Sequence, residues 1–240
     1  MLSCAKYTTI FPFTQGKSRD IIRKRGEKMR DIPFFDTQNG VAALVLKEIP
    51  YSKKAYITIL SSSDLSELLK ECVAFCRMVG AEQIYATGSE ELQFYPVWMQ
   101  LLQMRVVHPD FGNTLAAVEP VTQKSMQTWV DIYNQKMSRV DNSSHMTNLD
   151  ANKMLSRGDG YFVRRDGEVV GIVMAADGKL HALASVTPGG GTQCLQAIMQ
   201  TFRWDALELE VASTNSKAIS LYKRLGFAEK AIVSTWHKIV

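Results

Sequence analysis

Two Asp-Gly pairs in the second half of the chain constrain its fold more than any other feature of the sequence. Asp166-Gly167 and Asp177-Gly178 each stand between short apolar runs, and this arrangement is a strong signal for a β-hairpin. The runs Tyr161 to Arg165, Glu168 to Ala175 and Leu180 to Val186 are therefore predicted to be strands. Three strands in this meander order form an antiparallel sheet.

A strand, helix and strand follow the meander. Val186 to Thr192 is predicted to be a turn, and Gln193 to Phe202 a helix with one apolar face. Apolar residues alternate with glutamates in Ala206 to Val211, which predicts a strand. A helix, Asn215 to Leu225, and a last strand, Ala231 to Val240, complete the order. The predicted fold class is α/β (α+β), with a mixed, mostly antiparallel sheet flanked by helices.

The segment before the meander and the first half of the chain add further elements. Upstream of the meander we predict a strand and two helices: Thr114 to Val118, Thr122 to Met137 and Asn148 to Leu155. In the first half we predict four strands: Tyr7 to Phe13, Val41 to Ile49, Ala55 to Leu60 and Gln83 to Thr87. Ser61 to Asp64 caps a helix that reaches about Val79, and a second helix covers Leu92 to Leu102.

The order strand, helix, strand, helix occurs twice, in Ala55 to Met104 and in Leu180 to Phe227. Tyr95 and Tyr222 stand in the two final predicted helices. A duplication and a chance recurrence of a short αβ pattern both explain this similarity. The stretch from Val107 to Asn113 is the best boundary, which predicts domains at 1–110 and 111–240.

The segment Asn215 to Phe227 has every feature of a well-formed helix. Thr214 or Asn215 can cap its start, and Gly226 can adopt the left-handed conformation that ends it. Lys223 and Arg224 stand in the last turn, where the helix dipole favours cations. These structural requirements explain almost every position, but they do not require Asn and Tyr in particular.

The pattern Asn-x-x-Ala-x-x-Leu-Tyr-x-x-x-Gly-Phe in this segment resembles a motif of the GNAT (Gcn5-related N-acetyltransferase) superfamily. The resemblance covers Thr114 to Val240, and the order of elements there is the one that family uses. It implies an acyl-CoA N-acyltransferase fold, with two GNAT-like halves of which the first is degenerate. The implied function is N-acetyl transfer from acetyl-CoA to a primary amine by direct transfer.

The resemblance also implies where acetyl-CoA binds. The pyrophosphate is expected on backbone N–H groups at the start of the helix after the fourth strand of the domain. The residues concerned are Gly189, Gly190, Gly191 and Thr192, with the thioester carbonyl along Ala184, Ser185 and Val186 and a further contact at Asn215. This sequence departs from the family there, because the loop is shorter and its usual Gln or Arg is missing. The same glycines could also simply form a turn.

Tyr222 matches the tyrosine that often protonates the departing thiolate in this family, and a core aromatic residue is the structural alternative. His181 is the candidate general base, with Glu208 and Glu210 as weaker candidates by location. Alternating glutamates on a strand usually face solvent. An acceptor amine can also lose its proton through water.

Composition sets limits on other functions. The 240 residues carry a net charge of +4, and seven of the basic residues lie in Lys17 to Arg30. Acidic interruptions and the absence of interleaved aromatic residues favour a solvated helix face there over a nucleic-acid or membrane-surface helix. No apolar stretch approaches the ~18 residues of a membrane helix. We expect a cytoplasmic protein with a small-molecule or peptide amine substrate, and a homodimer remains open.

The cysteines and histidines indicate neither a disulfide framework nor a metal site. The four cysteines are Cys4, Cys72, Cys76 and Cys194. Cys72 and Cys76 share one face of a predicted helix, and without further ligands at useful spacing core packing is the better interpretation. His108, His145 and His237 have no metal-ligand spacing.

Two other functions stay open beside acetyl transfer. A non-catalytic GNAT-like module that binds a ligand or partner would explain the short Gly189 to Gly191 loop. A nucleic-acid-associated protein would use Lys17 to Arg30. For the first half we expect no cofactor site, because Asp64 at its helix start would repel phosphate. That half would instead shape the acceptor pocket or mediate association.

Overall fold

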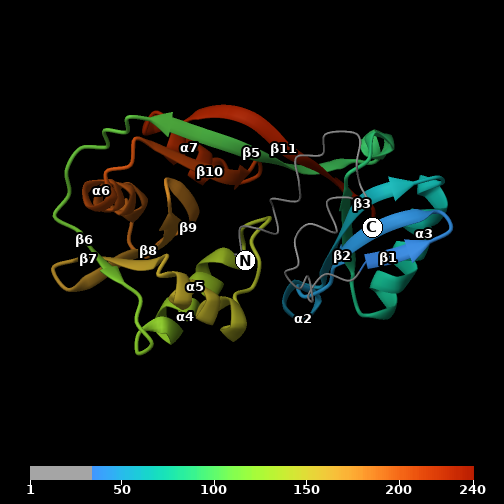
Figure 1. The fold of residues 1–240 in the computed structure, drawn as a ribbon, viewed down its shortest axis with the longest axis horizontal. Coiled ribbons are helices and arrows are strands. Elements are labelled where there is room, and N and C mark those ends of the chain that lie inside the picture. Colours follow the sequence, from blue (N-terminus) through green and yellow to red (C-terminus); the bar gives the residue numbers. More distant parts are fainter. Residues whose placement is uncertain (1–33) are drawn as a thin grey trace. The chain divides into compact units, whose positions relative to one another are not determined.

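The computed structural model describes residues 34–240, which form two compact units (Figure 1). The N-terminal unit holds residues 34–100 together with Ser234–Val240, and the C-terminal unit holds Leu101–Val233. Two strands, β5 (Val97–Val107) and β11 (Ala228–Lys238), contribute residues to both units. Three features of the sequence lie outside the described residues: the predicted strand Tyr7 to Phe13, the basic run Lys17 to Arg30, and Cys4.

The N-terminal unit is a sheet with the strand order β1-β2-β3-β4-β11 and helix α3 packed on β2 and β3. Its elements are β1 (Phe34–Thr37), β2 (Gly40–Val45), α2 (Ile49–Ser52), β3 (Lys54–Ser62), α3 (Leu65–Met78), β4 (Gln83–Thr87) and the short 3₁₀ helix η2 (Glu90–Phe94). The strands predicted at Val41 to Ile49, Ala55 to Leu60 and Gln83 to Thr87 are present, although the first ends at Val45. The helix predicted after Asp64 is present as α3.

The predicted helix Leu92 to Leu102 is wrong. η2 ends at Phe94, and Tyr95 is extended, with φ −97° and ψ 150°. Pro96 explains this break, because a proline disfavours the helical conformation of the residue before it. Burial along β5 then follows the strand period at Met99 and Leu101, which are almost fully buried. Tyr95 therefore does not stand in a helix as Tyr222 does, and the internal similarity ends at β4.

The C-terminal unit is a mixed sheet with the strand order β5-β10-β9-β8-β7-β6. Its other elements are β6 (Ala117–Pro120), α4 (Met126–Met137), α5 (Asn148–Arg157), β7 (Gly160–Arg165), β8 (Glu168–Ala176), β9 (Lys179–Ser185), α6 (Gly190–Phe202), β10 (Ala206–Ala212) and α7 (Ser216–Arg224). Among the described strands of this unit, β9 and β10 are the one parallel pair. The pairs β5–β10, β8–β9, β7–β8 and β6–β7 are antiparallel. The predicted fold class is confirmed.

The two predicted hairpins are also confirmed. Asp166 and Asp177 have positive φ values of 53° and 50°, and the glycines after them have φ values of 83° and 72°. Positive φ at both central residues is the requirement of the tight hairpin turn that Asp-Gly favours. β7, β8 and β9 therefore form the antiparallel meander, with β6 added at its edge.

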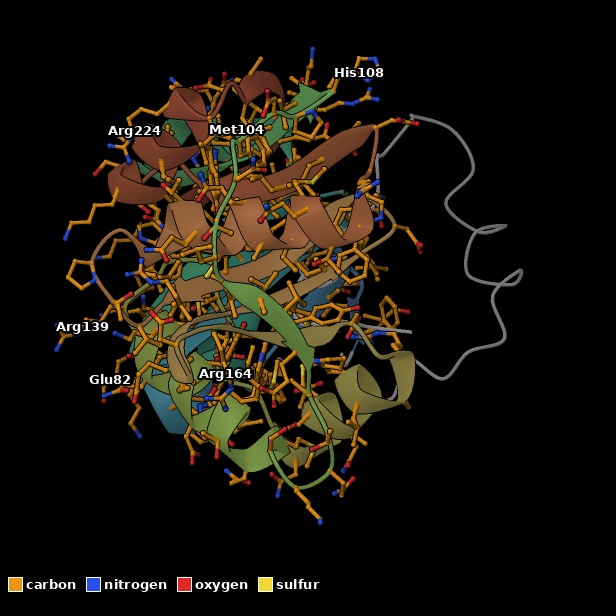
Figure 2. The ribbon with its side chains drawn as sticks, turned by 90° about the vertical axis from the view of Figure 1, so that its left-hand side faces the viewer. Glu82, Met104, His108, Arg139, Arg164 and Arg224 are labelled. Carbon is orange, nitrogen blue, oxygen red and sulfur yellow. The ribbon has the colours of Figure 1, made fainter. Side chains whose placement is uncertain are left out.

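Helices cover both faces of this sheet. On one face α6 packs on β8 and β9, in a core that also contains apolar residues of β5 and β10, among them the fully buried Met104, which is labelled in Figure 2. On the other face α4 and α5 form a second core around Trp129, whose indole N–H donates to the carbonyl of Tyr161 at 3.0 Å. Thr147 and Asp150 form a capping box that fixes the start of α5.

The three cysteines of the described chain are buried, as core packing predicts. Burial raises the pKa of Cys72 to about 12, that of Cys76 to about 11 and that of Cys194 to about 12. A thiol with so high a pKa holds little of the reactive thiolate at neutral pH. Within residues 34–240, no helix has both the length and the apolarity that spanning a membrane requires.

Candidate functional site

The parallel strands β9 and β10 separate soon after they meet. They pair only at Lys179 with Glu208 and at Leu180 with Leu209. Beyond these two pairs the edge of β9 has no strand partner on the β10 side among residues 34–240, although β9 runs on to Ser185. α6 follows β9 and α7 follows β10, so the separating strands lead to two helix starts. We call this region the β9–β10 opening.

A β-bulge in β9 marks the beginning of the β9–β10 opening. Met174 on β8 pairs with Ala182 and the next residue, Ala175, pairs with Leu180, so His181 is the extra residue on β9. The bulge resets the alternation of side chains, and Leu180 and Leu183 both contact the α6 core. The candidate base His181 therefore lies where parallel pairing ends, and its predicted role in catalysis stays a prediction.

The backbone of β9 presents polar groups to this opening. The N–H of Val186 donates to the carbonyl of Val170 at 2.8 Å, so Val186 is bonded toward β8. Bonding alternates along an antiparallel strand, so Ala184 also bonds toward β8 and Ser185 faces the other way. Among the three residues predicted to lie along the thioester, Ser185 is thus the one whose N–H faces the β9–β10 opening.

Three glycines form the start of α6. The helix begins at Gly190 rather than at the predicted Gln193, after Gly189 in the left-handed region with φ 72°. A Cβ on Gly190 would lie 2.7 Å from the carbonyl oxygen of Val170, and one on Gly191 would lie 2.8 Å from Leu221 Cδ2. Close packing against β8 and α7 therefore requires these glycines, whatever the start of α6 binds.

The donors at the start of α6 suit a phosphate group, although they are few. The N–H of Gly190 donates to Thr187 O at 3.1 Å, and the N–H of Thr192 donates to Gly189 O at 3.2 Å. Among the described residues, the Gly191 N–H and the Thr192 hydroxyl have no hydrogen-bond partner. The helix has no side-chain cap and no acidic residue in its first turn. An uncapped helix start of this kind favours an anion.

Apolar side chains line the inner part of the β9–β10 opening. Leu221 of α7 and Leu183 of β9 both approach Gly191, at 2.8 and 3.7 Å from the position of its ideal Cβ. Both leucines pack on the α6 core and are partly buried. Leu221, in the second turn of α7, and Leu183 of β9 therefore place both elements in hydrophobic contact with the start of α6.

Tyr222 is a core residue whose phenol keeps its proton. Its side chain is buried against Phe227, with the ring centroids 5.4 Å apart. Burial raises the pKa of Tyr222 to about 12. At neutral pH the hydroxyl is therefore protonated, as a proton donor must be. Tyr222 therefore acts as a core aromatic residue, and its catalytic role stays a prediction.

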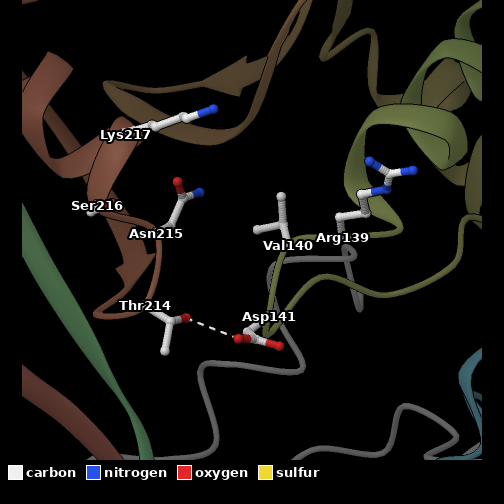
Figure 3. Close-up of a pocket in the computed structure, with 7 residues that line it drawn as sticks. All are labelled: Arg139, Val140, Asp141, Thr214, Asn215, Ser216 and Lys217. Carbon is white, nitrogen blue, oxygen red and sulfur yellow. Dashed lines mark hydrogen bonds between the residues drawn. The ribbon is translucent and has the colours of Figure 1, made fainter.

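Asn215 caps the start of α7. Its side-chain oxygen accepts a hydrogen bond from the N–H of Ala218 at 3.2 Å, which leaves its amide hydrogens for another partner. A cavity of about 230 Å³ lies beside it, with Arg139, Val140 and Asp141 on one wall and residues 214–217 on the other (Figure 3). The Thr214 hydroxyl donates to Asp141 Oδ2 across the cavity at 3.0 Å.

Residues 139–141 lie between the predicted helices Thr122 to Met137 and Asn148 to Leu155, so their place on the wall of this cavity was not predicted. Glu208, one of the weaker base candidates, forms an ion pair with Arg105 at 3.3 Å. In the described part of the chain, no group of three or more His, Cys, Asp or Glu residues could hold a metal ion. The expectation that the protein needs no metal stays a prediction.

No protein-family model and no curated protein matches the sequence. Solved structures do match it. One is a GCN5-related N-acetyltransferase from Sphaerobacter thermophilus, 12% identical with a TM-score of 0.55, and the match covers 99% of this chain and 89% of that one. A functionally unknown conserved protein from Staphylococcus epidermidis ATCC 12228 is 10% identical with a TM-score of 0.52, covering 87% and 93%.

A GCN5-related N-acetyltransferase from Anabaena variabilis ATCC 29413 is 10% identical, with a TM-score of 0.56. That match covers 85% of this chain and 57% of the Anabaena protein, so this chain spans less than two thirds of its length. At these identities the similarity establishes the fold. The resemblance seen in the sequence is thus confirmed at the level of structure: the chain has the fold of the GCN5-related N-acetyltransferases.

Proposed function

We propose that this protein is an N-acetyltransferase that moves an acetyl group from acetyl-CoA to a primary amine by direct transfer. The observation that carries the proposal is the separation of β9 and β10 after two residue pairs. The separation exposes a strand edge beside a helix start that has neither a side-chain cap nor an acidic residue. This combination offers a polar edge for a thioester and a positive helix end for phosphate.

The start of α6 and the edge of β9 would hold acetyl-CoA, which supplies the acyl group as a reactive thioester. Gly189 to Thr192 would bind its phosphates through the Gly191 N–H, the Thr192 hydroxyl and the helix dipole. The Ser185 N–H would donate to the thioester carbonyl oxygen and stabilise the negative charge that develops there. Asn215 would contribute its amide hydrogens from the other helix start.

Tyr222 would donate a proton and His181 would accept one during the transfer. The buried Tyr222 phenol is protonated at neutral pH, since its pKa is about 12, and could protonate the departing thiolate. A primary amine with a pKa of about 10.4 must lose a proton before it can attack. His181, at the bulge that begins the opening, is our candidate for accepting that proton.

The proposal includes the setting of the reaction. We place the protein in the cytoplasm, with a small-molecule or peptide amine as its second substrate and no requirement for a metal. We further propose that residues 1–110 and 111–240 derive from two GNAT-like halves. Only the second would bind acetyl-CoA.

Calorimetric titration with acetyl-CoA tests the first requirement of the proposal. We expect micromolar binding that weakens in Thr192→Val, which removes a hydroxyl at the start of α6. Thr201→Val is the matched control, because its hydroxyl donates to Ala197 O near the end of the same helix. An absence of binding at high micromolar acetyl-CoA would contradict the proposal.

A non-catalytic GNAT-like binding module is the second candidate. Two observations favour it: the Gly190 and Thr192 amides already donate to backbone carbonyls, and Leu221 lies against Gly191. Both reduce what the start of α6 can offer to a phosphate. Acetyl turnover with any member of a broad amine panel, lost in Tyr222→Phe, would rule this candidate out.

A further inference from the structure

Each of the two units contains part of a strand that belongs to the other half of the chain. The loop of residues 108–116, between β5 and β6, separates the two halves. β5 precedes this loop, yet its residues from Leu101 onward lie in the C-terminal unit. β11 follows the loop, yet its residues from Ser234 onward lie in the N-terminal unit, together with Ile239 and Val240. The two halves have therefore exchanged strand segments.

The first half completes the sheet of the C-terminal unit through β5. This strand pairs with β10 over seven residue pairs, from Ala206 with Val107 to Ala212 with Leu101. Met104 of β5 is fully buried in the core that contains α6. On its other edge β10 pairs with β9 at two positions. Without β5, β10 would therefore lose most of its strand pairing, and the core would lose a large side chain.

The second half completes the sheet of the N-terminal unit through the end of β11. In strand order β11 lies between β4 and β5. The N–H of Ile239 donates to the carbonyl of Ile84 at 2.9 Å, and the Thr87 hydroxyl donates to the carbonyl of Thr235 at 2.7 Å. Ile239 also packs on the core that contains α3. Without this segment the buried strand β4 would have unpaired backbone groups on one edge.

We propose that this exchange of strands interlocks the two halves, so that the two units fold and unfold as one cooperative structure. Domain boundaries usually fall in flexible linkers, which let each domain unfold separately. Here the chain passes between the units inside β5 and β11, which are each 11 residues long without a break and are adjacent in the sheet. The first half thus acts by completing the unit that contains the β9–β10 opening, and this role needs no cofactor site. A ligand of either unit then stabilises both.

Cutting the loop between β5 and β6 tests the proposal on the full chain. A protease site inserted between Gly112 and Asn113, which are both exposed, allows the protein to be cut after it has folded. We expect the two fragments to stay together until they unfold, so that size-exclusion chromatography and circular dichroism change at the same urea concentration. The urea midpoint should rise with protein concentration, because unfolding then also separates two chains. The same protein left uncut is the control, and its midpoint should depend less on concentration.

Matched isoleucine substitutions test the coupling in the uncut protein by hydrogen exchange. Ile57→Val in the α3 core and Ile198→Val in the α6 core each remove one methylene from a fully buried side chain. Ile232→Val makes the same change at an exposed position of β11. We expect each core variant to speed the slowest-exchanging amides of both units by one common factor, about two- to tenfold. Ile232→Val should leave these rates unchanged.

Two results would overturn the proposal. If the cut fragments separate while each keeps the circular dichroism of a folded protein, the halves are independent domains. If a core substitution speeds exchange in its own unit alone, the units open separately and the shared strands do not couple them. Neither test uses acetyl-CoA, so the interlock can fail while the proposed function stands, and the acetyl-CoA titration can fail while the interlock stands.

Discussion

The two units contain the same strand, helix and parallel strand, and they use it in opposite ways. In the N-terminal unit β3 and β4 stay paired over five residue pairs, from Lys54 with Gln83 to Thr58 with Thr87. In the C-terminal unit β9 and β10 pair at two positions and then separate. Full pairing satisfies the backbone groups between the strands, whereas separation leaves an edge that a ligand can use.

The helices after β3 and β9, α3 and α6, differ in whether a side chain caps their start. Asp64 caps α3 with its carboxylate, which accepts a hydrogen bond from the Glu67 N–H at 3.1 Å. The start of α6 has Gly189 in that place and no side-chain cap. A carboxylate at a helix start both uses the N–H donors and repels phosphate, so it excludes the ligand that a glycine start admits. Pairing and capping together thus distinguish β3-α3-β4, a structural βαβ unit, from β9-α6-β10, the unit that we propose binds acetyl-CoA.

The largest effect should come from Tyr222, the tyrosine that follows β10, with Tyr95, which follows β4, as its control. Tyr222→Phe removes a buried proton donor and should lower acetyl turnover about 100-fold or more, the typical contribution of general acid catalysis. Tyr95→Phe should leave turnover unchanged, because the contact of Tyr95 with His237 uses its backbone oxygen. Steady-state rates of both variants check this. An equal loss of turnover in the two variants would contradict the functional difference that we propose between the units.

The glycine start of α6 should be the next most sensitive feature. In Gly190→Ala the new Cβ would lie 2.7 Å from Val170 O, and this overpacking should cost up to about 3 kcal/mol of unfolding free energy. Acetyl-CoA binding should fall with it, because the helix start must shift. Chemical denaturation and calorimetry measure the two effects. If Gly190→Ala kept full stability and full affinity for acetyl-CoA, the close contact of Gly190 with Val170 would not be required for either.

Alkaline pH should weaken the C-terminal unit through Tyr222. Its pKa is raised from 10.0 to about 12 by burial, so the folded state binds more protons than the unfolded state between these values. The resulting stabilisation is fully present below pH 10 and is lost as the pH rises through about 12, at about 1.4 kcal/mol per pKa unit. Thermal unfolding from pH 9 upward should show a shallower loss in Tyr222→Phe than in the parent protein. Identical slopes would show that the phenol is not desolvated.

The smallest effect belongs to the cap of the N-terminal unit. Asp64→Ala should cost about 1 kcal/mol of stability, the usual value of a lost N-cap. Acetyl-CoA affinity should not change, because we assign no cofactor to α3. Asp64→Asn keeps a capping oxygen and serves as the matched control. A gain of a second acetyl-CoA site in either variant would show that the carboxylate alone had blocked an otherwise functional start.

Local signals explain why much of the C-terminal unit could be predicted from the sequence. Asp166-Gly167 and Asp177-Gly178 define their own turns, and the cap at Asn215 and the cations at Lys223 and Arg224 define α7 without help from the rest of the chain. The segment Leu92 to Leu102, predicted to be one helix, is helical only as far as Phe94 and continues from Val97 as β5. Its pairing with β10, a strand far along the chain, decides the conformation.

Parts of the candidate site depend on tertiary contacts that no local pattern encodes. Consecutive glycines disfavour a helix by propensity, and the contacts of Gly190 with Val170 and of Gly191 with Leu221 nevertheless place these two glycines in α6. The bulge at His181 depends on register with β8. Residues 139–141 line one cavity with residues 214–217 only because the chain after α4 returns to the start of α7.

A crystal structure of the protein soaked with CoA tests the central claim most directly, namely that the β9–β10 opening alone is the cofactor site. We expect the diphosphate at Gly189 to Thr192, on the Gly191 N–H and the Thr192 hydroxyl, with the thiol end directed along β9 toward Ser185. CoA bound at Ser61 to Leu65, beside the capped start of α3, would contradict it. So would a fully soaked crystal in which the start of α6 holds no CoA.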